Sequence, residues 1–151
     1  MDTQTFVDFL IRAKRDTYAS GRAPDSSSRP SSHDLSYVEG DLKYIDTYLG
    51  GFHFIGEEAV WQGNIPLWGM NYYGKMLAGE FPEGFSEFLK AALLRVPREA
   101  PFRGPAEFHA GNFDYICKWQ GELKRFVGEE EIFYNGERVY WLAFHGGEIK
   151  D

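Results

Sequence analysis

The sequence has little cysteine, no excess of positive charge and no long apolar run. Its single cysteine, Cys117, excludes an intramolecular disulfide and suits a reducing compartment. Lys and Arg total 16 against 23 Asp and Glu, a formal net charge of −7, so we expect no direct binding to nucleic acid or to an anionic membrane. No apolar run approaches the roughly 18 residues of a membrane span, so we expect a soluble, cytoplasmic protein.

Common signatures of metal, cofactor and hydrolase sites are also missing. The histidines have no close metal-ligand spacing, so we expect no metal site. The sequence has no glycine-rich phosphate loop, no dinucleotide fingerprint and no Gly-x-Ser-x-Gly, so we expect no cofactor. Cys117 lies in an expected strand between two larger side chains and is interpreted as a packed thiol rather than a nucleophile. We expect a binding module rather than an enzyme.

An internal duplication is the strongest positive signal. Phe6, Phe9, Leu10 and Ala13 form the apolar stripe of an amphipathic helix, and the same residue types recur at the same spacing in Phe85, Phe88, Leu89 and Ala92. Downstream, residues 36–48 align with 107–119 without a gap, and 61–74 align with 133–146. We therefore predict a single domain, 1–151, made of repeat 1 (about 3–74) and repeat 2 (about 82–147).

Each copy is predicted to be one helix followed by four antiparallel strands. Aromatic and β-branched residues separated by glycine-containing turns indicate strands at 35–38, 42–49, 52–61, 67–73, 106–109, 113–120, 123–133 and 138–145. The fold class is α+β: two αββββ units related by a pseudo-twofold axis. They form either one continuous sheet with both helices on one face, or two facing sheets. The paired glycines Gly40/Gly111 and Gly56/Gly128 are interpreted as turn or bulge positions.

Differences between the two copies are the candidates for function, because architecture explains what the copies share. The first copy has Asp46 where the second has Cys117. The first helix is also followed by a long Ser-rich connection, 17–34, which admits two interpretations. It is either a mobile surface loop, or a lid that presents four polar side chains to a ligand on the sheet: Arg29, Ser32, His33 and Asp34.

Aromatic side chains, 17% of the sequence, supply the second clue to a ligand. Most are expected in the core, but Tyr and Trp also offer the apolar area with a polar tip that small-molecule sites use. We predict a pocket in the first repeat, with the 17–34 loop at its rim, bordered by Tyr44, Asp46, Tyr48, Glu57, Trp61, Asn71 and Tyr73.

Two alternatives remain beside the ligand-binding module. One is an enzyme that uses Glu57 or Glu58 with His33 and Asp34 as acid and base groups. Adjacent strand residues point to opposite faces, so Glu57 and Glu58 do not converge; approach of either to Glu129 or Glu130 across the pseudo-twofold would raise a carboxyl pKa. The other is an interaction protein that forms a homodimer through a sheet surface or edge.

Four motifs in order resemble bacterial domains of unknown function 5680: SRPSSHDL at 28–35, YIDTYLGG at 44–51, GEEAVW at 56–61 and MNYYG at 70–74. In that family the domain often follows a helix-turn-helix of the XRE transcriptional-regulator type. Here the sequence enters the first apolar stripe almost directly after Met1, so we expect the domain without that DNA-binding part. The resemblance implies a sensory role, with an unknown small molecule as partner, and offers no catalytic residues to transfer.

Overall fold

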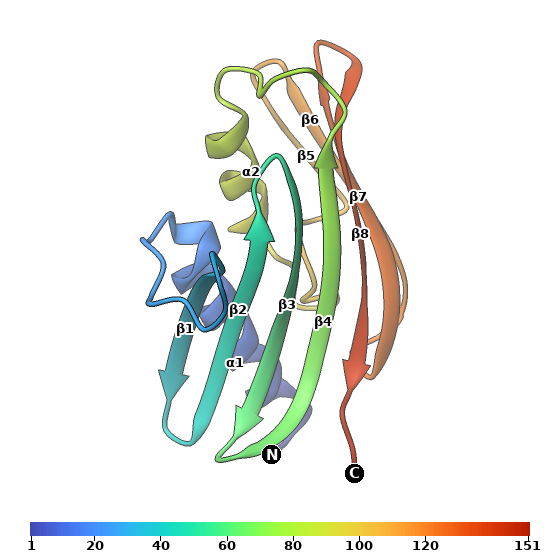
Figure 1. Cartoon of the computed structure of the whole chain (residues 1–151). Helices are drawn as coiled ribbons and strands as arrows, with labels where there is room; N and C mark the ends of the chain where they lie inside the picture. The colour runs from blue at the N-terminus through green and yellow to red at the C-terminus, as the bar shows by residue number, and fades with distance from the viewer.

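The computed structural model describes all 151 residues and contains one eight-stranded antiparallel sheet (Figure 1). The strand order is β1-β2-β3-β4-β8-β7-β6-β5, so the continuous-sheet alternative is correct and the α+β class is confirmed. The strands are β1 (His33–Glu39), β2 (Leu42–Gly50), β3 (His53–Gln62), β4 (Ile65–Met76), β5 (Glu107–Ala110), β6 (Phe113–Glu122), β7 (Arg125–Tyr134) and β8 (Glu137–Glu148).

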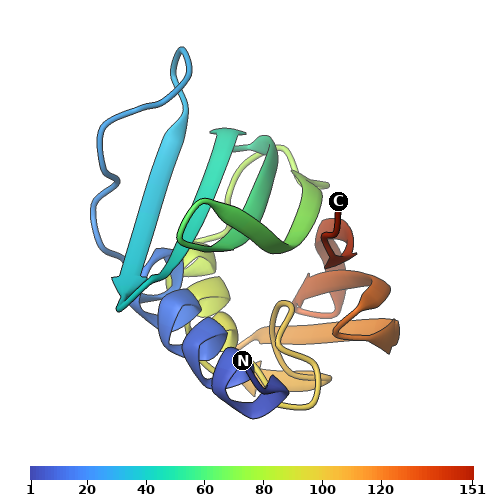
Figure 2. The same cartoon turned by 90° about the horizontal axis from the view of Figure 1, so that it is seen from below.

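Both helices lie inside the curve of the sheet (Figure 2). Helix α1 (Thr3–Asp16) has Asp2 as its N-cap. The Asp2 carboxylate accepts the backbone N–H of Thr5 at 2.9 Å. Helix α2 (Phe85–Leu93) follows the first four strands. The predicted apolar stripes are buried on both helices and form the core against the concave face of the sheet. No helix of the structure has the length and apolarity to cross a membrane.

Hairpin register decides which side chains face the helices. In the β2–β3 hairpin Gly50 pairs with Phe54, and this register sets Asp46 opposite Glu58. In the β6–β7 hairpin Cys117 lies opposite Glu130 in the same way. Because side chains alternate along a strand, these residues point to the concave face while their neighbours in sequence point to the convex face.

The paired glycines have two different causes. Gly40 and Gly111 have φ of 62° and 58° and occupy turns, as predicted. Gly56 and Gly128 lie inside regular strands, so the turn or bulge prediction is wrong for them. A Cβ on Gly56 would overlap the ring of Tyr72 on β4, and a Cβ on Gly128 would overlap Phe144 on β8. Here glycine makes room for an aromatic ring, and at Gly56 it lets Tyr72 lie flat across the sheet.

All eight predicted strands are present, and β4 and β8 extend beyond their predicted ends, whereas residues 123–124, predicted to lie in a strand, form a turn. These two residues form the turn between β6 and β7, although Leu123 was predicted to begin a strand. The carbonyl of Leu123 accepts Trp68 Nε1–H at 3.0 Å, and the carbonyl of Lys124 accepts the N–H of Glu148 at 3.0 Å. Contacts from distant parts of the chain therefore hold the turn against the strand propensity of its sequence.

Candidate functional site

Five charged side chains are buried on the concave face, beneath the helices. Three are carboxylates and two are cations, and none of them is more than 9% exposed. Buried charges cost several kcal/mol each unless they are paired and hydrogen-bonded, so their partners determine the role of each group. The five are Lys14 from α1, Asp46 from β2, Glu58 from β3, Arg103 from the α2–β5 connection and Glu130 from β7.

Glu130 is completely buried and fully paired. Arg103 donates to both of its oxygens, from Nε at 3.1 Å and from Nη2 at 2.5 Å. The hydroxyls of Tyr115 and Tyr140 donate to it at 2.5 and 2.6 Å. This bidentate pair neutralises both charges, and Glu130 raises the pKa of Arg103 well above its ordinary value against the opposing effect of burial.

Glu58 is paired in the same manner on the other side of the concave face. Lys14 Nζ donates to Glu58 Oε1 at 2.5 Å and to the carbonyl of Phe102 at 2.8 Å. The hydroxyl of Tyr44 donates to the same carboxylate. Burial lowers the pKa of Lys14, and the neighbouring Glu58 counteracts that shift. Two cations thus pair with two of the three carboxylates.

Asp46 is the carboxylate left without a cation of its own. Its side chain is only 5% exposed, and its one hydrogen bond comes from the Tyr72 hydroxyl to Oδ1 at 2.5 Å. Burial, and then the nearby charge of Glu58, raise the pKa of Asp46 from 3.8 to about 7. Every fully buried polar side-chain atom in the protein has a hydrogen-bond partner, so the unbonded Oδ2 of Asp46 must border open space.

Asp46 lines a cavity of about 270 Å³ between the sheet and the helices. The same reasoning places Arg103 Nη1, which makes no hydrogen bond, in contact with a cavity that the residue lines. A smaller cavity lined by Lys14 and Glu58 adjoins it and shares Asp46, Arg103 and Tyr18. Most of the remaining lining of the larger cavity is aromatic or polar: Tyr18, His33, Tyr48, Phe54, Tyr72, Phe81, Phe85, Ser86 and Tyr140.

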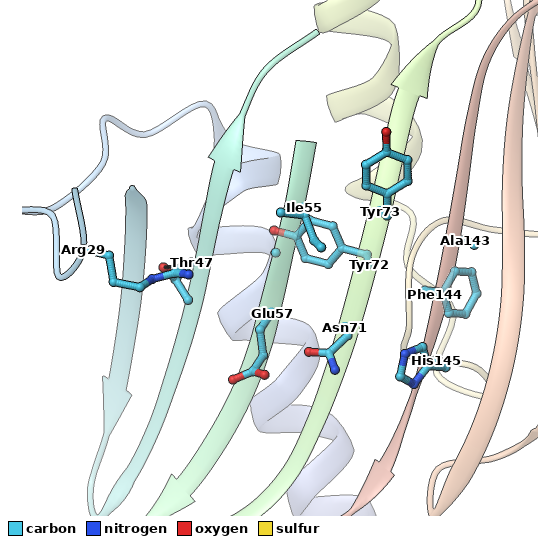
Figure 3. A pocket seen from close by; sticks show the side chains of 11 residues that line it. Arg29, Thr47, Ile55, Glu57, Asn71, Tyr72, Tyr73, Ala143, Phe144 and His145 are labelled. Carbon is cyan, nitrogen blue, oxygen red and sulfur yellow. Dashed lines mark hydrogen bonds between the residues drawn. The ribbon is translucent and has the colours of Figure 1, made fainter. Parts of the chain in front are cut away.

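The convex face has an open groove of about 730 Å³ across β3, β4 and β8. Figure 3 shows Glu57, Asn71 and His145 side by side along it, as their pairing in register requires. Arg29 reaches its rim and donates to Thr47 Oγ1 at 2.7 Å. Glu57, Asn71 and His145 are all solvent-exposed. The groove is therefore a solvated surface, whereas the concave cavity encloses its charged groups.

The predicted site residues are divided between these two places. The concave cavity contains Asp46, Tyr48 and His33, and Tyr44 lies deeper, bonded to Glu58. The convex face carries Glu57, Asn71, Tyr73 and Arg29 in its groove, and Trp61 lies on the same face opposite Lys43. The prediction of one pocket bordered by all of them is wrong, because it combined even positions of β2 with odd positions of β3 and β4, and the register places these on opposite faces of the sheet.

The 17–34 connection is an ordered strap along the edge strand β1. It starts with a short 3-10 helix, Tyr18–Ser20, which carries Tyr18 to the cavity. Further along, the N–H of Asp25 donates to the carbonyl of Asp34 at 2.7 Å, and Asp25 Oδ2 accepts from the N–H of Ser36 at 2.9 Å. The strap therefore covers the exposed edge of β1.

Ser32 and Asp34 anchor this strap and do not reach the cavity. Asp34 accepts the N–H of Ser28 at 3.0 Å, the hydroxyl of Ser32 at 2.9 Å and the hydroxyl of Thr47 at 2.7 Å. Burial alone would raise the pKa of Asp34, but these hydrogen bonds outweigh it and lower the pKa to about 2. His33 faces the other way, stacked on Tyr48 with ring centroids 4.8 Å apart, so Asp34 does not orient it.

We expect alanine substitutions of Asp34 and His33 to differ in their effect on stability. Asp34→Ala removes the acceptor of three donors and should lower the free energy of unfolding by about 1–3 kcal/mol. His33→Ala removes an exposed ring with no hydrogen bond and should change it by no more than about 0.5 kcal/mol. Urea denaturation of both variants measures the difference. Equal losses would contradict this assignment of anchor and cavity rim.

The sequence analysis missed Lys14 and Arg103, the two cations of the site. Lys14 directly follows Ala13 of the apolar stripe, and helical spacing alone gives no sign of a buried cation there. Arg103 lies in a connection without periodicity. The predicted approach of Glu58 to Glu129 or Glu130 is also wrong, because β4 and β8 lie between β3 and β7. The carboxylate next to Glu58 is that of Asp46.

Cys117 behaves as the packed thiol that its position predicts. It is buried on β6, opposite Glu130. Burial, followed by the charge of Glu130, raises its pKa to about 12, so the thiolate is scarce at neutral pH. In the first half of the sheet, the position opposite Glu58 carries the ionisable Asp46, and this makes the first half the chemically distinct one.

The family model of the domain of unknown function DUF5680 matches residues 46–149, more than half of the chain. The chain belongs to the DUF5680 family. The match includes Asp46, Arg103 and Glu130 of the buried cluster, together with the second half of the sheet. The comparison with curated proteins found no match, and neither did the comparison with solved structures. The DUF5680 match confirms the resemblance and leaves the activity to be argued from the site.

Proposed function

We propose that this DUF5680 domain binds a small molecule in the concave cavity and acts as a sensory module. The observation that carries the proposal is that Asp46 and Arg103, each with a side-chain atom that makes no hydrogen bond, line one cavity between the sheet and the helices. A mostly apolar, aromatic lining with a few convergent polar groups is typical of small-molecule sites. The volume, about 270 Å³, suits a ligand smaller than a typical drug.

The polar atoms around the cavity support this proposal. The hydroxyls of Tyr18 and Tyr48 have no protein hydrogen-bond partner. Burial raises the pKa of both hydroxyls, and that of Tyr48 to about 12. They remain protonated donors at neutral pH. With His33 at the rim, the cavity offers donors and acceptors that protein groups leave unused.

The proposal includes the duplication of an αββββ unit as the origin of the site. Two observations support the duplication. The strands of each half follow one another from an edge of the sheet to its centre, and Asp46 pairs with Glu58 as Cys117 pairs with Glu130. In this view the second half keeps a fully neutralised carboxylate for stability. The first half has Asp46 where the second has Cys117, and it carries the ligand site. The link to transcriptional regulation rests on the family resemblance alone.

For the enzymatic alternative, the structure requires a different acid or base residue from the predicted Glu57 or Glu58. Glu57 is on the convex face, and Glu58 is paired with Lys14, so the predicted combination with His33 and Asp34 has no common location. Asp46, with a pKa of about 7, is the group suited to proton transfer, and an enzyme at this site would use it as general acid or base. Conversion of a bound ligand on prolonged incubation would favour this alternative.

Dimerisation through the β1 edge is disfavoured because the 17–34 strap covers that edge.

A tryptophan at the cavity mouth should block binding. Ser86 on α2 lines the cavity and is exposed, whereas its neighbour Glu87 is exposed outside it. In a ligand-observed NMR screen of single-ring aromatic fragments, we expect binders to wild type and to the control Glu87→Trp, and loss of these binders in Ser86→Trp. Fragments that bind all three proteins equally would place binding outside the cavity, and a screen without binders would overturn the proposed function.

A further inference from the structure

We propose that the preferred ligand of the concave cavity is a small organic cation, a protonated amine on an aromatic body, whose ammonium group pairs with the free oxygen of Asp46. This inference rests on the proposed function and names the chemical class of its ligand. It follows from the charges of the buried cluster, the free atoms at the cavity and the aromatic lining.

The charge count favours a cation. Arg103 and Glu130 neutralise each other through two hydrogen bonds, and Lys14 and Glu58 neutralise each other through one. With both pairs formed, ionised Asp46 leaves the buried cluster with one net negative charge. A bound anion would add a second negative charge in a nearly dry site, whereas an ammonium group would supply the missing counter-ion.

The free atoms agree with this count. Asp46 Oδ2 is an acceptor without a donor, and an ammonium group brings three donors. Arg103 Nη1 also borders the cavity, but its charge is already neutralised by Glu130 and its face is directed over the Tyr72 ring at 5.5 Å. Arg103 therefore offers a hydrogen bond to the ligand without holding an uncompensated positive charge against it.

Aromatic faces around Asp46 complete the site. Tyr18, Tyr48, Phe54, Phe85 and Tyr140 line the same cavity from the 3-10 helix, three strands and α2. Aromatic faces attract cations, and the attraction grows when the cation is desolvated. The protein already shows this preference nearby, because Lys90 Nζ lies 5.7 Å from the centroid of the Tyr18 ring. A ring on the ligand would pack against the remaining apolar wall.

Binding of an amine should tighten as the pH rises. The ionised carboxylate is the binding form, and the pKa of Asp46 is about 7, so an amine should bind about tenfold more tightly at pH 8 than at pH 6. The titratable groups that border Asp46 or its cavity are Lys14, Tyr18, His33, Tyr44, Tyr48, Glu58, Tyr72, Arg103 and Tyr140. Because His33 also lines the cavity, the Asp46→Asn variant must be measured at both pH values.

Three probes that share a phenyl ring test the ligand class. We would titrate 2-phenylethylamine, phenylacetamide and phenylacetate into the full chain by calorimetry at pH 6 and pH 8, with Asp46→Asn and the convex-face control Glu57→Gln. The amine should bind most tightly to wild type and to Glu57→Gln. Asp46→Asn should weaken it by at least about tenfold and remove its pH dependence, without weakening phenylacetamide.

Each other outcome separates this inference from the proposed function. Tighter binding of phenylacetamide would indicate a neutral ligand, and tighter binding of phenylacetate an anion read by Arg103; both overturn the amine class and leave the cavity as a ligand site. Amine affinity equal in Asp46→Asn and wild type also overturns it. If none of the probes binds while the fragment screen yields cavity binders, the amine class fails alone; if both experiments yield nothing, both proposals fail.

Discussion

Replacing Arg103 with methionine should lower the free energy of unfolding by about 3–5 kcal/mol. Methionine keeps much of the apolar volume of arginine, so the loss reports the charge and its hydrogen bonds rather than an empty space. Glu130 is 0% exposed and would keep only the hydroxyls of Tyr115 and Tyr140 as partners. A carboxylate left uncompensated in this position must either remain charged at high cost or take up a proton.

Arg98→Met is the matched control for this experiment. Arg98 also forms an ion pair, with Asp8, but both side chains are largely exposed. An exposed pair contributes little, so this variant should lose no more than about 1 kcal/mol. Urea denaturation of both variants under the same conditions compares a buried with an exposed pair. Similar losses in the two variants would contradict the buried role of Arg103.

The double variant Arg103→Met, Glu130→Gln separates the missing charge from the missing contacts. Glutamine carries no charge; its oxygen accepts one tyrosine hydroxyl and its NH2 group donates to the other, so the double variant should regain part of the stability lost by Arg103→Met alone. If the double variant is no more stable than Arg103→Met, the instability of Arg103→Met comes from packing, and the ion pair is not its cause.

Periodicity was sufficient to predict the helices and the number of strands. The stripes from Phe6 and Phe85 are buried as expected, and each half has four strands, because apolar spacing is a local property that survives in the folded chain. Whether one sheet or two would form was open in the sequence. That depends on β4 pairing with β8 across some seventy residues, and no local pattern records such a contact.

The candidate site was only half predictable, for a reason that register explains. The alignment of the two halves of the sequence identified Asp46 as a difference between them, and the Gly50-Gly51 turn contained the signal that sets Asp46 opposite Glu58. Counting back from that turn would have separated Glu58 from Glu57. The same count does not place Asn71 and Tyr73 on β4, because the register between β3 and β4 shifts between Val60 and Trp61. Arg103 gave no such signal, because its position depends on how an irregular connection folds onto β7.

Asp46→Asn should make the protein more stable at pH 8 and remove much of its pH dependence. The pKa of Asp46 is raised from 3.8 to about 7 in the folded state, so between these values the folded chain binds a proton that the unfolded chain has released. Its contribution is present at low pH and is lost as the pH rises through 7. For wild type we expect the free energy of unfolding to fall by about 2–3 kcal/mol from pH 5 to pH 8.

Asp34 does not disturb this window, although its pKa is also shifted. Its pKa is lowered to about 2, so its contribution has the opposite sign: it is present above pH 4 and is lost only as the pH falls toward 2. Glu57→Gln, which removes an exposed carboxylate one strand away, controls for the change of carboxylate to amide and should keep the wild-type slope. Equal slopes in Asp46→Asn and Glu57→Gln would show that another group titrates.

The two curves for wild type and Asp46→Asn should converge toward pH 4, separate as the pH rises from 4 to 7, and keep a constant difference above pH 7. Asparagine has the shape of the protonated aspartic acid and still accepts the Tyr72 hydroxyl, so it should match wild type at low pH, where Asp46 is neutral in both the folded and the unfolded chain. Above pH 7 it avoids the burial of a charge without a cation. A position where an uncharged isostere is more stable at neutral pH carries its charge at the expense of stability, and binding sites commonly show this trade. A loss of stability in Asp46→Asn at pH 8 would mean that the carboxylate holds the fold together, and it would remove the reason to assign Asp46 to a ligand.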